Sequence, residues 1–183
     1  MLALIFILGG LGFGTVFNFY TFIKNKCKGL IFLFLRKEVK HKAQYFSFNT
    51  KFIVVCNAIV LLLVTVSYFL LEQRHTLMQD RTVYGEWVTS FFMANASRSA
   101  GFNSVNMGFL SAPTLIMLST LMWIGASPGS TGGGVKVTTV AVAFLNIIAL
   151  ARGKDAIEVF NRRIAGESIY KAFAIIVLSV VVI

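Results

Sequence analysis

An apolar segment that is too long for a membrane constrains this chain more than any other feature. Residues 111–151 are mostly apolar, and some forty residues of helix would extend about 60 Å. The hydrocarbon core of a bilayer is only about 30 Å thick. The segment must therefore break. Glycine and proline, the residues that a helix tolerates least, concentrate over residues 126–136, and the break is predicted there.

Composition places the chain in a membrane. Hydrophobic residues make up 57% of the 183 residues and charged residues 13%, against about 45–50% and about 25% in soluble domains. The net charge of +10 would suggest a nucleic-acid partner for a soluble protein. In a membrane protein it is typical of basic cytoplasmic loops, so no nucleic acid is expected and lipid is the expected surrounding.

Three further apolar segments are long enough to be membrane helices or parts of them: residues 1–23, 52–71 and 170–183. Small residues allow close helix packing, so a packing face is predicted in the first segment from Gly9, Gly10, Gly12 and Gly14. Residues 83–97 would give about 22 Å of helix, which is too short to cross comfortably.

The charged loops predict the orientation. Residues 24–51 hold eight Lys or Arg against one acid, and residues 152–171 hold five against three. Residues 72–82 hold two of each sign. Because cytoplasmic loops are enriched in Lys and Arg, the first two loops are expected inside and the third outside. The short helix over 83–97 then has both ends outside, as a re-entrant pore helix does.

Small residues follow this short helix in the sequence Ser-Arg-Ser-Ala-Gly-Phe-Asn-Ser, residues 97–104. The C-terminal end of a helix favours a cation, and backbone carbonyls can replace the water shell of potassium. Glycine at Gly101 permits backbone conformations that a side chain would block. The pattern favours an ion filter, although an ordinary turn in an outer loop has the same composition.

Arg98 is the residue that fits a cation path least well. Either its side chain points away from the path and ties the filter to its surroundings, or the filter interpretation is wrong. Glu86, earlier on the same helix, is a possible partner.

The spacing of the candidate residues does not match the motifs of a nucleotide-binding or catalytic site. A phosphate loop needs Gly-Lys-Ser/Thr, but Val135 separates Gly134 from Lys136 and Val137 follows the lysine. The two histidines, His41 and His75, are expected on opposite sides of the membrane. No enzyme activity is predicted.

Four stretches together resemble the Trk/Ktr potassium transporters. Residues 97–102 look like the third filter of that family, and residues 125–139 look like the glycine-rich break in the second helix of the same repeat. Residues 9–13 are similar to the second helix of the preceding repeat. Residues 152–163 are similar to the basic linker into the fourth repeat.

The resemblance implies an all-α membrane protein built from four helix–pore loop–helix repeats around one pore. This chain would supply the end of repeat two (1–23), a basic cytoplasmic loop (24–51), all of repeat three (52–151), a basic linker (152–169) and the start of repeat four (170–183). Repeat three would consist of a helix (52–71), a pore helix (83–97), a filter (97–104) and a broken helix (111–151). Because the chain begins and ends inside apolar helices, a fragment is expected.

The resemblance also implies the ion-binding residues and a gate. The filter would be Ser99, Ala100, Gly101 and Phe102, with potassium held by the backbone of the first three. The gating loop would comprise Gly125, Ala126, Ser127, Pro128, Gly129, Ser130, Thr131, Gly132, Gly133, Gly134 and Lys136. The Lys136 charge would either raise a barrier to cations or simply extend toward the interface.

The implied function is potassium uptake across a bacterial inner membrane by a multi-pass subunit, with potassium as substrate and no cofactor in this chain. The implied partners are a cytosolic nucleotide-binding regulatory subunit and a second copy of the full-length subunit. The alternative is a non-conducting membrane scaffold or a permease fragment of another transporter. A scaffold would tolerate substitution of Gly101, whereas a filter would not.

Overall fold

The computed structural model describes residues 2–34, 48–73, 75–79, 82–99, 101–153, 157–160 and 162–182. Nearly all the regular structure is helical, as the sequence predicted. In chain order the elements are α1 (Leu2–Gly10), α2 (Phe13–Phe34), α3 (Phe48–Glu72), η1 (Thr76–Gln79), α4 (Val83–Ser99), η2 (Met107–Phe109), α5 (Ala112–Trp123), α6 (Val137–Ala151), β1 (Glu158–Val159), β2 (Arg162–Arg163) and α7 (Gly166–Val182).

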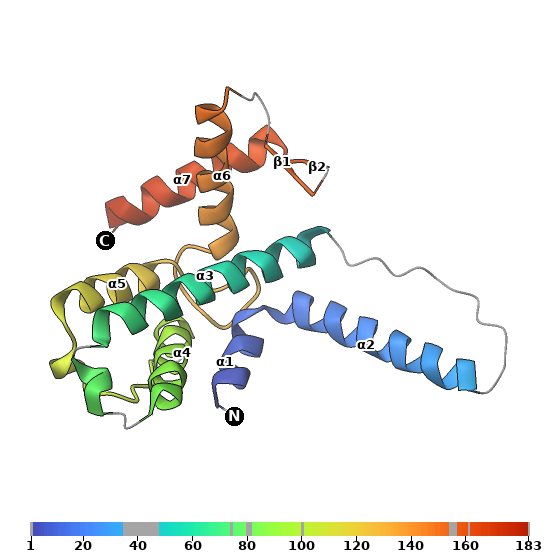
Figure 1. The fold of residues 1–183 in the computed structure, drawn as a ribbon. Coiled ribbons are helices and arrows are strands. Elements are labelled where there is room, and N and C mark those ends of the chain that lie inside the picture. Colours follow the sequence, from blue (N-terminus) through green and yellow to red (C-terminus); the bar gives the residue numbers. More distant parts are fainter. Residues whose placement is uncertain are drawn as a thin grey trace.

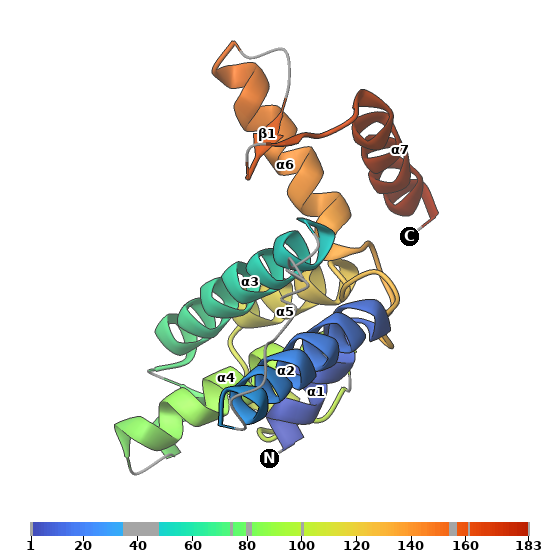
Figure 2. The same ribbon diagram turned by 90° about the vertical axis from the view of Figure 1, so that its right-hand side faces the viewer.

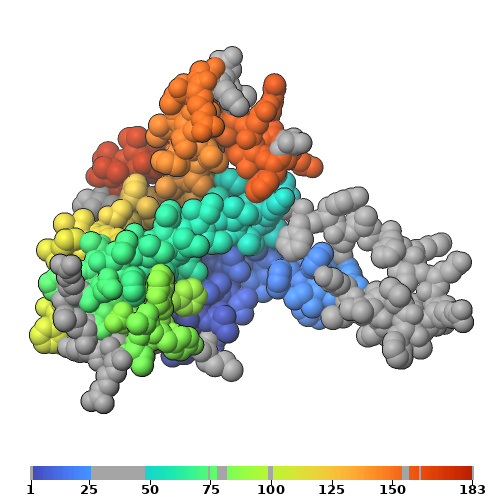
Figure 3. All heavy atoms as spheres, in the orientation of Figure 1, coloured from blue at the N-terminus to red at the C-terminus, as the bar shows by residue number. Residues whose placement is uncertain are grey.

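Helix α3 is the centre of the structure. It contacts α4, α5 and α6, while α1 packs on α4 and α7 packs on α6 (Figures 1 and 2). Space-filling shows α1, α3, α4 and α5 as one continuous packed body (Figure 3). Two buried clusters lie among α3, η1, α4, α5 and the residue Leu110 that precedes α5: Tyr68, Leu77, Met93, Leu110 and Leu118 in one, and Val64, Ala94 and Leu121 in the other.

Only part of the chain meets the length and apolarity of a complete membrane span. Within the described ranges, α3 is the one unbroken helix that does so. Helices α1 and α2 meet the criterion as a bent pair, and α5 and α6 are shorter apolar helices. Each of these two pairs is therefore an interrupted segment rather than a straight span.

The prediction of one helix over residues 1–23 was wrong, because the segment bends by 107° between α1 and α2. We call residues 10–13 the elbow. Gly12 in the elbow has a φ of +81°, and a Cβ there would collide with the carbonyl oxygen of Pro128. Glycine adopts such a conformation without the steric cost of a side chain, so the elbow forms where the sequence suggested only a packing face.

Helix α2 also extends further than predicted. It continues to Phe34, into the stretch expected to be a loop from residue 24. Lysine is a good helix former and no proline interrupts the stretch, so the basic residues do not end the helix. Of the rest of the predicted loop, residues 35–47 lie outside the described residues and residues 48–51 belong to α3.

Helix α3 begins at Phe48, four residues before the predicted start at residue 52. Lys51 is accommodated in its first turn, where the ammonium lies 4.3 Å from the ring centroid of Phe160. A cation over an aromatic face is an attractive arrangement. The charge therefore does not prevent the helix from starting early.

The predicted linker 152–169 contains two short elements that the sequence did not suggest. Strands β1 and β2 form an antiparallel hairpin in which Glu158 pairs with Arg163. Helix α7 starts at Gly166 rather than at 170, with Glu167 in its first turn and bonded to Lys171 at 2.6 Å. An acid near a helix N-terminus and an i,i+4 ion pair both favour this earlier start.

The helix predicted over 83–97 is present as α4, although it continues to Ser99, so the filter boundary at 97 falls inside the helix. The break predicted over 126–136 is confirmed. Helix α5 ends at Trp123 and α6 starts at Val137, and the two run in different directions (Figure 1). We call residues 124–136 the break segment.

A buried carboxylate joins the ends of α3, η1 and α5. Glu72 is fully buried, and its oxygens accept bonds from the backbone and hydroxyl of Ser111 (2.9 and 2.7 Å) and from Thr76 (2.7 Å to the hydroxyl). Ser111 is the N-cap of α5, but its hydroxyl makes no capping bond to that helix. Glu72 instead places a negative charge at the N-terminus of α5, where the helix dipole favours it.

We predict that Glu72→Gln destabilises the protein. An amide presents an NH₂ group to hydrogen-bond donors that now face a carboxylate oxygen, and a bond to a charged group contributes roughly 1.5–3 kcal/mol. The measurement is the thermal unfolding midpoint in detergent. Glu167→Gln, at a side chain that is 78% exposed, is the matched control, and equal midpoints for the two variants would contradict the role assigned to Glu72.

Candidate functional site

The chain reverses at the end of α4 through a left-handed glycine. Gly101 has a φ of +64°, and its N–H donates to the Ala96 carbonyl at 2.9 Å, which closes the helix end. No atom lies within 4 Å of where a Cβ would be. The position thus favours glycine for its conformation rather than for lack of space, as the sequence suggested.

The structure describes only some of the predicted filter residues. Gly101 and Phe102 are exposed, and the Phe102 ring stacks on Phe6 of α1 with centroids 5.8 Å apart. Ser99 is the last residue of α4, and Ala100 lies outside the described residues. Potassium binding by the backbone of Ser99, Ala100 and Gly101 stays a prediction.

Arg98 points into the protein rather than along the exposed turn. One guanidinium nitrogen donates to Asn57 Oδ1 of α3 at 3.0 Å and to the Gly125 carbonyl of the break segment at 3.2 Å. Its described bonds thus lead to α3 and the break, not to Glu86. The charge also lies in the last turn of α4, where the helix dipole favours a cation.

The break segment is a compact loop whose two limbs lie side by side. Ile124 and Val135 form a parallel bridge, and the Val135 N–H donates to the Trp123 carbonyl at 2.9 Å. A Cβ on Gly125 would overlap the Gly133 carbonyl, and one on Gly132 would lie 2.6 Å from the Cβ of Ala126. The two limbs approach this closely because side chains are missing from these positions.

The elbow and the break segment bind each other through their backbones. The Ser127 N–H donates to the Gly10 carbonyl at 3.1 Å, and the Phe13 N–H donates to the Gly129 carbonyl at 3.0 Å. Non-helical backbone at membrane depth is tolerated only where protein or water satisfies its polar groups. Each interruption therefore supplies partners that the other needs.

Lys136 lies where the break segment enters α6. Lys136 is the N-cap residue of α6, and its ammonium donates a hydrogen bond to the Gly132 carbonyl at 2.8 Å. A positive charge at a helix N-terminus opposes the helix dipole. The bond back to Gly132 therefore keeps the charge at the break segment instead of letting it extend away.

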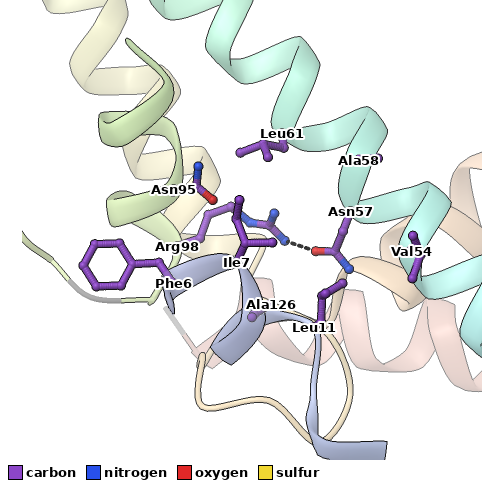
Figure 4. A pocket seen from close by; sticks show the side chains of 11 residues that line it. Phe6, Ile7, Leu11, Val54, Asn57, Ala58, Leu61, Asn95, Arg98 and Ala126 are labelled. Atoms are coloured by element: carbon purple, nitrogen blue, oxygen red, sulfur yellow. Dashed lines mark hydrogen bonds between the residues drawn. The ribbon is translucent and has the colours of Figure 1, made fainter. Parts of the chain in front are cut away.

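A cavity of about 180 Å³ lies between α1, α3, the end of α4 and the break segment (Figure 4). Asn57, Asn95 and Arg98 supply its polar lining among mostly apolar side chains. Figure 4 shows the Arg98 side chain crossing this space toward Asn57. The cavity thus marks the place where four elements meet behind the predicted filter.

Two parts of this site were not predicted from the sequence. Asn57 is the only amide side chain within the apolar residues 52–71, and this position alone could have singled it out. The elbow was signalled by its glycines, but these were interpreted as a packing face alone. Of the predicted residues, the structure brings together Arg98, Gly125 and Ser127 around Asn57.

Comparison with known proteins matches the whole chain to one family. The family model TrkH, described as a cation transport protein, matches residues 1–183. The Ktr system potassium uptake protein B of Vibrio alginolyticus is 36% identical over 97% of this chain and 36% of its own length. The protein of the same name from Bacillus subtilis is 31% identical over 100% of this chain and 37% of its own length.

A solved structure has a similar fold. The potassium transporter TrkH from Vibrio parahaemolyticus superimposes with a TM-score of 0.55 at 22% identity, covering 70% of this chain and 29% of that protein. The chain thus spans little more than a third of the length of the two Ktr proteins, and its match covers less than a third of the TrkH structure.

We predict that Gly125→Ala destabilises the break segment. Its Cβ would occupy the place of the Gly133 carbonyl, and such overpacking costs typically about 1–3 kcal/mol. The thermal unfolding midpoint in detergent measures the effect. Gly133→Ala is the matched control, because nothing lies within 4 Å of its Cβ position. Equal loss in both variants would show that the close approach does not matter.

Proposed function

The chain belongs to the TrkH family of cation transport proteins, and on this premise we propose that it forms part of a potassium-conducting pore. Potassium is the proposed substrate, and no cofactor or chemical reaction is involved. The backbone around residues 99–101 would bind dehydrated potassium as one quarter of a filter, and the break segment would act as the gate.

One observation carries this proposal: the break segment touches the helix end that precedes the predicted filter. The Gly125 carbonyl accepts a bond from Arg98, and a Cβ on Gly132 would lie 3.2 Å from the Arg98 carbonyl. Gly101 follows three residues later in a left-handed conformation. A loop in this place can obstruct a path that ends at residues 99–101.

The direction of Arg98 supports the proposal. A cation projecting beside the filter would repel potassium, and at 4 Å this repulsion is about 4 kcal/mol at an intermediate dielectric constant. The Arg98 guanidinium is instead directed toward Asn57 and the cavity (Figure 4). The presence of Arg98 next to the predicted filter is therefore compatible with a cation path.

We further propose that the whole subunit is a multi-pass protein of a bacterial inner membrane that works with other chains. A cytosolic nucleotide-binding regulatory subunit would contact the basic stretches 24–51 and 152–169, and two copies of the full-length subunit would pair. The support is the resemblance of this chain to Ktr system potassium uptake proteins.

A non-conducting scaffold is the second candidate function. Its support is the extent of glycine-mediated packing between the elbow and the break segment, which would serve structure alone. A scaffold and a filter differ in their response to substitution at Gly101, where no atom lies within 4 Å of a Cβ.

We predict that Gly101→Ser lowers the potassium-to-sodium flux ratio of the full-length subunit in liposomes by about tenfold. A side chain in the left-handed conformation costs roughly 1–2 kcal/mol, and 1.4 kcal/mol corresponds to about tenfold in an equilibrium. Relaxation of this strain would move the carbonyls that bind the ion.

Gly153→Ser is the matched control, because Gly153 has a φ of +66° with open space around its Cβ position, at the far end of α6. It should incur the same strain and keep the flux ratio. An unchanged ratio in Gly101→Ser, with potassium flux intact, would favour the scaffold.

We predict that Lys136→Ala raises potassium flux through the full-length subunit. The ammonium holds a positive charge at the break segment through its 2.8 Å bond to Gly132, and its removal would lower the barrier to a cation there. Flux of a potassium isotope into liposomes measures this, with Lys171→Ala on the exposed face of α7 as control. Normal flux in Lys136→Ala would contradict a gating charge.

A further inference from the structure

The side-chain amide of Asn57 lies at the centre of a polar network. Its Oδ1 accepts from the Arg98 guanidinium at 3.0 Å, while its Nδ2 donates to Ser127 Oγ at 2.5 Å and to the Ile53 carbonyl at 3.0 Å. A guanidinium has only donors, so it must face the amide oxygen. This fixes the amide orientation and leaves its NH₂ group for Ser127.

The network connects three separate elements. Asn57 belongs to α3, Arg98 to the last turn of α4 and Ser127 to the break segment. Arg98 also bonds to the Gly125 carbonyl, and the Ser127 N–H bonds to the Gly10 carbonyl in the elbow. The end of the predicted pore helix and the break segment are thus held against α3 by shared bonds.

Among the described residues, neutral oxygens and no carboxylate bind the Arg98 guanidinium. Its described partners are an amide oxygen and a backbone carbonyl, and its Nε is buried without a partner among the described residues. A buried group that loses a partner incurs its full desolvation cost. Displacement of Gly125 and Ser127 would therefore leave Arg98 dependent on Asn57 alone.

We propose that Asn57 is a positioning residue that couples the break segment to the predicted filter. Through Arg98 and Ser127 it holds both in one relative arrangement, so a movement of the break segment displaces the end of α4 just before Gly101. The expected consequence is that loosening this network alters ion selectivity as well as gating. This consequence rests on the proposed function.

The test uses the full-length subunit in liposomes, four single variants and one double variant. Asn57→Leu keeps the approximate shape and removes both polar links. Asn57→Asp keeps an acceptor for Arg98 and accepts from the Ser127 hydroxyl, so it should retain function. Ser127→Ala removes one link, and Cys56→Ala, at the neighbouring α3 position outside the network, is the matched control.

We expect Asn57→Leu to lower the potassium-to-sodium flux ratio at least about fivefold, the lower end of common coupling between sites. Asn57→Asp and Cys56→Ala should keep the ratio. Since Asn57→Leu and Ser127→Ala break the same link, the double variant should show less than the sum of their separate effects. Ser127→Ala also serves as the independent test if Asn57→Leu fails to fold.

A second readout does not depend on conduction. Thr131, in the exposed part of the break segment, is replaced by cysteine in a cysteine-free background, and its rate of modification by a water-soluble thiol reagent is measured. Asn57→Leu and Ser127→Ala should each speed modification, whereas Asn57→Asp should not. Unchanged flux ratios and unchanged modification rates in both would overturn the proposal.

The two readouts separate the two hypotheses. Absence of potassium-selective flux in the unaltered full-length subunit would overturn the proposed function. The modification rates would still decide whether Asn57 positions the break segment, because they measure its arrangement directly.

Discussion

The satisfaction of backbone polar groups in the break segment is the requirement on which this structure depends. In a bilayer each unpaired N–H or C=O costs several kcal/mol, and residues 124–136 interrupt an otherwise apolar helical stretch. Their bonds go inward to Trp123, across to Gly10 in the elbow and to the side chain of Arg98. The break can exist because the segment formed by α1 and α2 is also interrupted, at the elbow, so the two irregular regions stabilise each other.

Helix α3 holds the surrounding elements through polar contacts at two levels. Near its middle, Asn57 fixes the end of α4 and the break segment. At its end, Glu72 fixes η1 and the start of α5. Between these levels the contacts are apolar clusters, and apolar packing is less directional than hydrogen bonding. The two polar levels therefore set the register of α4 and α5 along α3.

The sequence predicted the parts of the fold that follow from length and charge. The break between α5 and α6 was predictable because residues 111–151 exceed the membrane thickness, and α4 because residues 83–97 fall short of it. The elbow was not, because its hydrogen-bond partners, Ser127 and Gly129, lie over a hundred residues away in the chain. The early start of α7 depends on the local ion pair between Glu167 and Lys171. The length of the apolar segment gives no indication of such a pair.

The candidate site was predictable to the same extent. Residue type and order identified Gly101 and the break segment, whereas the sequence around Asn57 does not indicate its role, because that role comes from partners on two other elements. The structure also changes the reason for the glycines. At Gly125 and Gly132 they permit close packing of two limbs besides interrupting the helix, and packed interiors tend to have discrete alternative arrangements instead of deforming continuously. A gate built from this segment would accordingly switch between arrangements, and the polar bonds of Asn57 are what it must exchange.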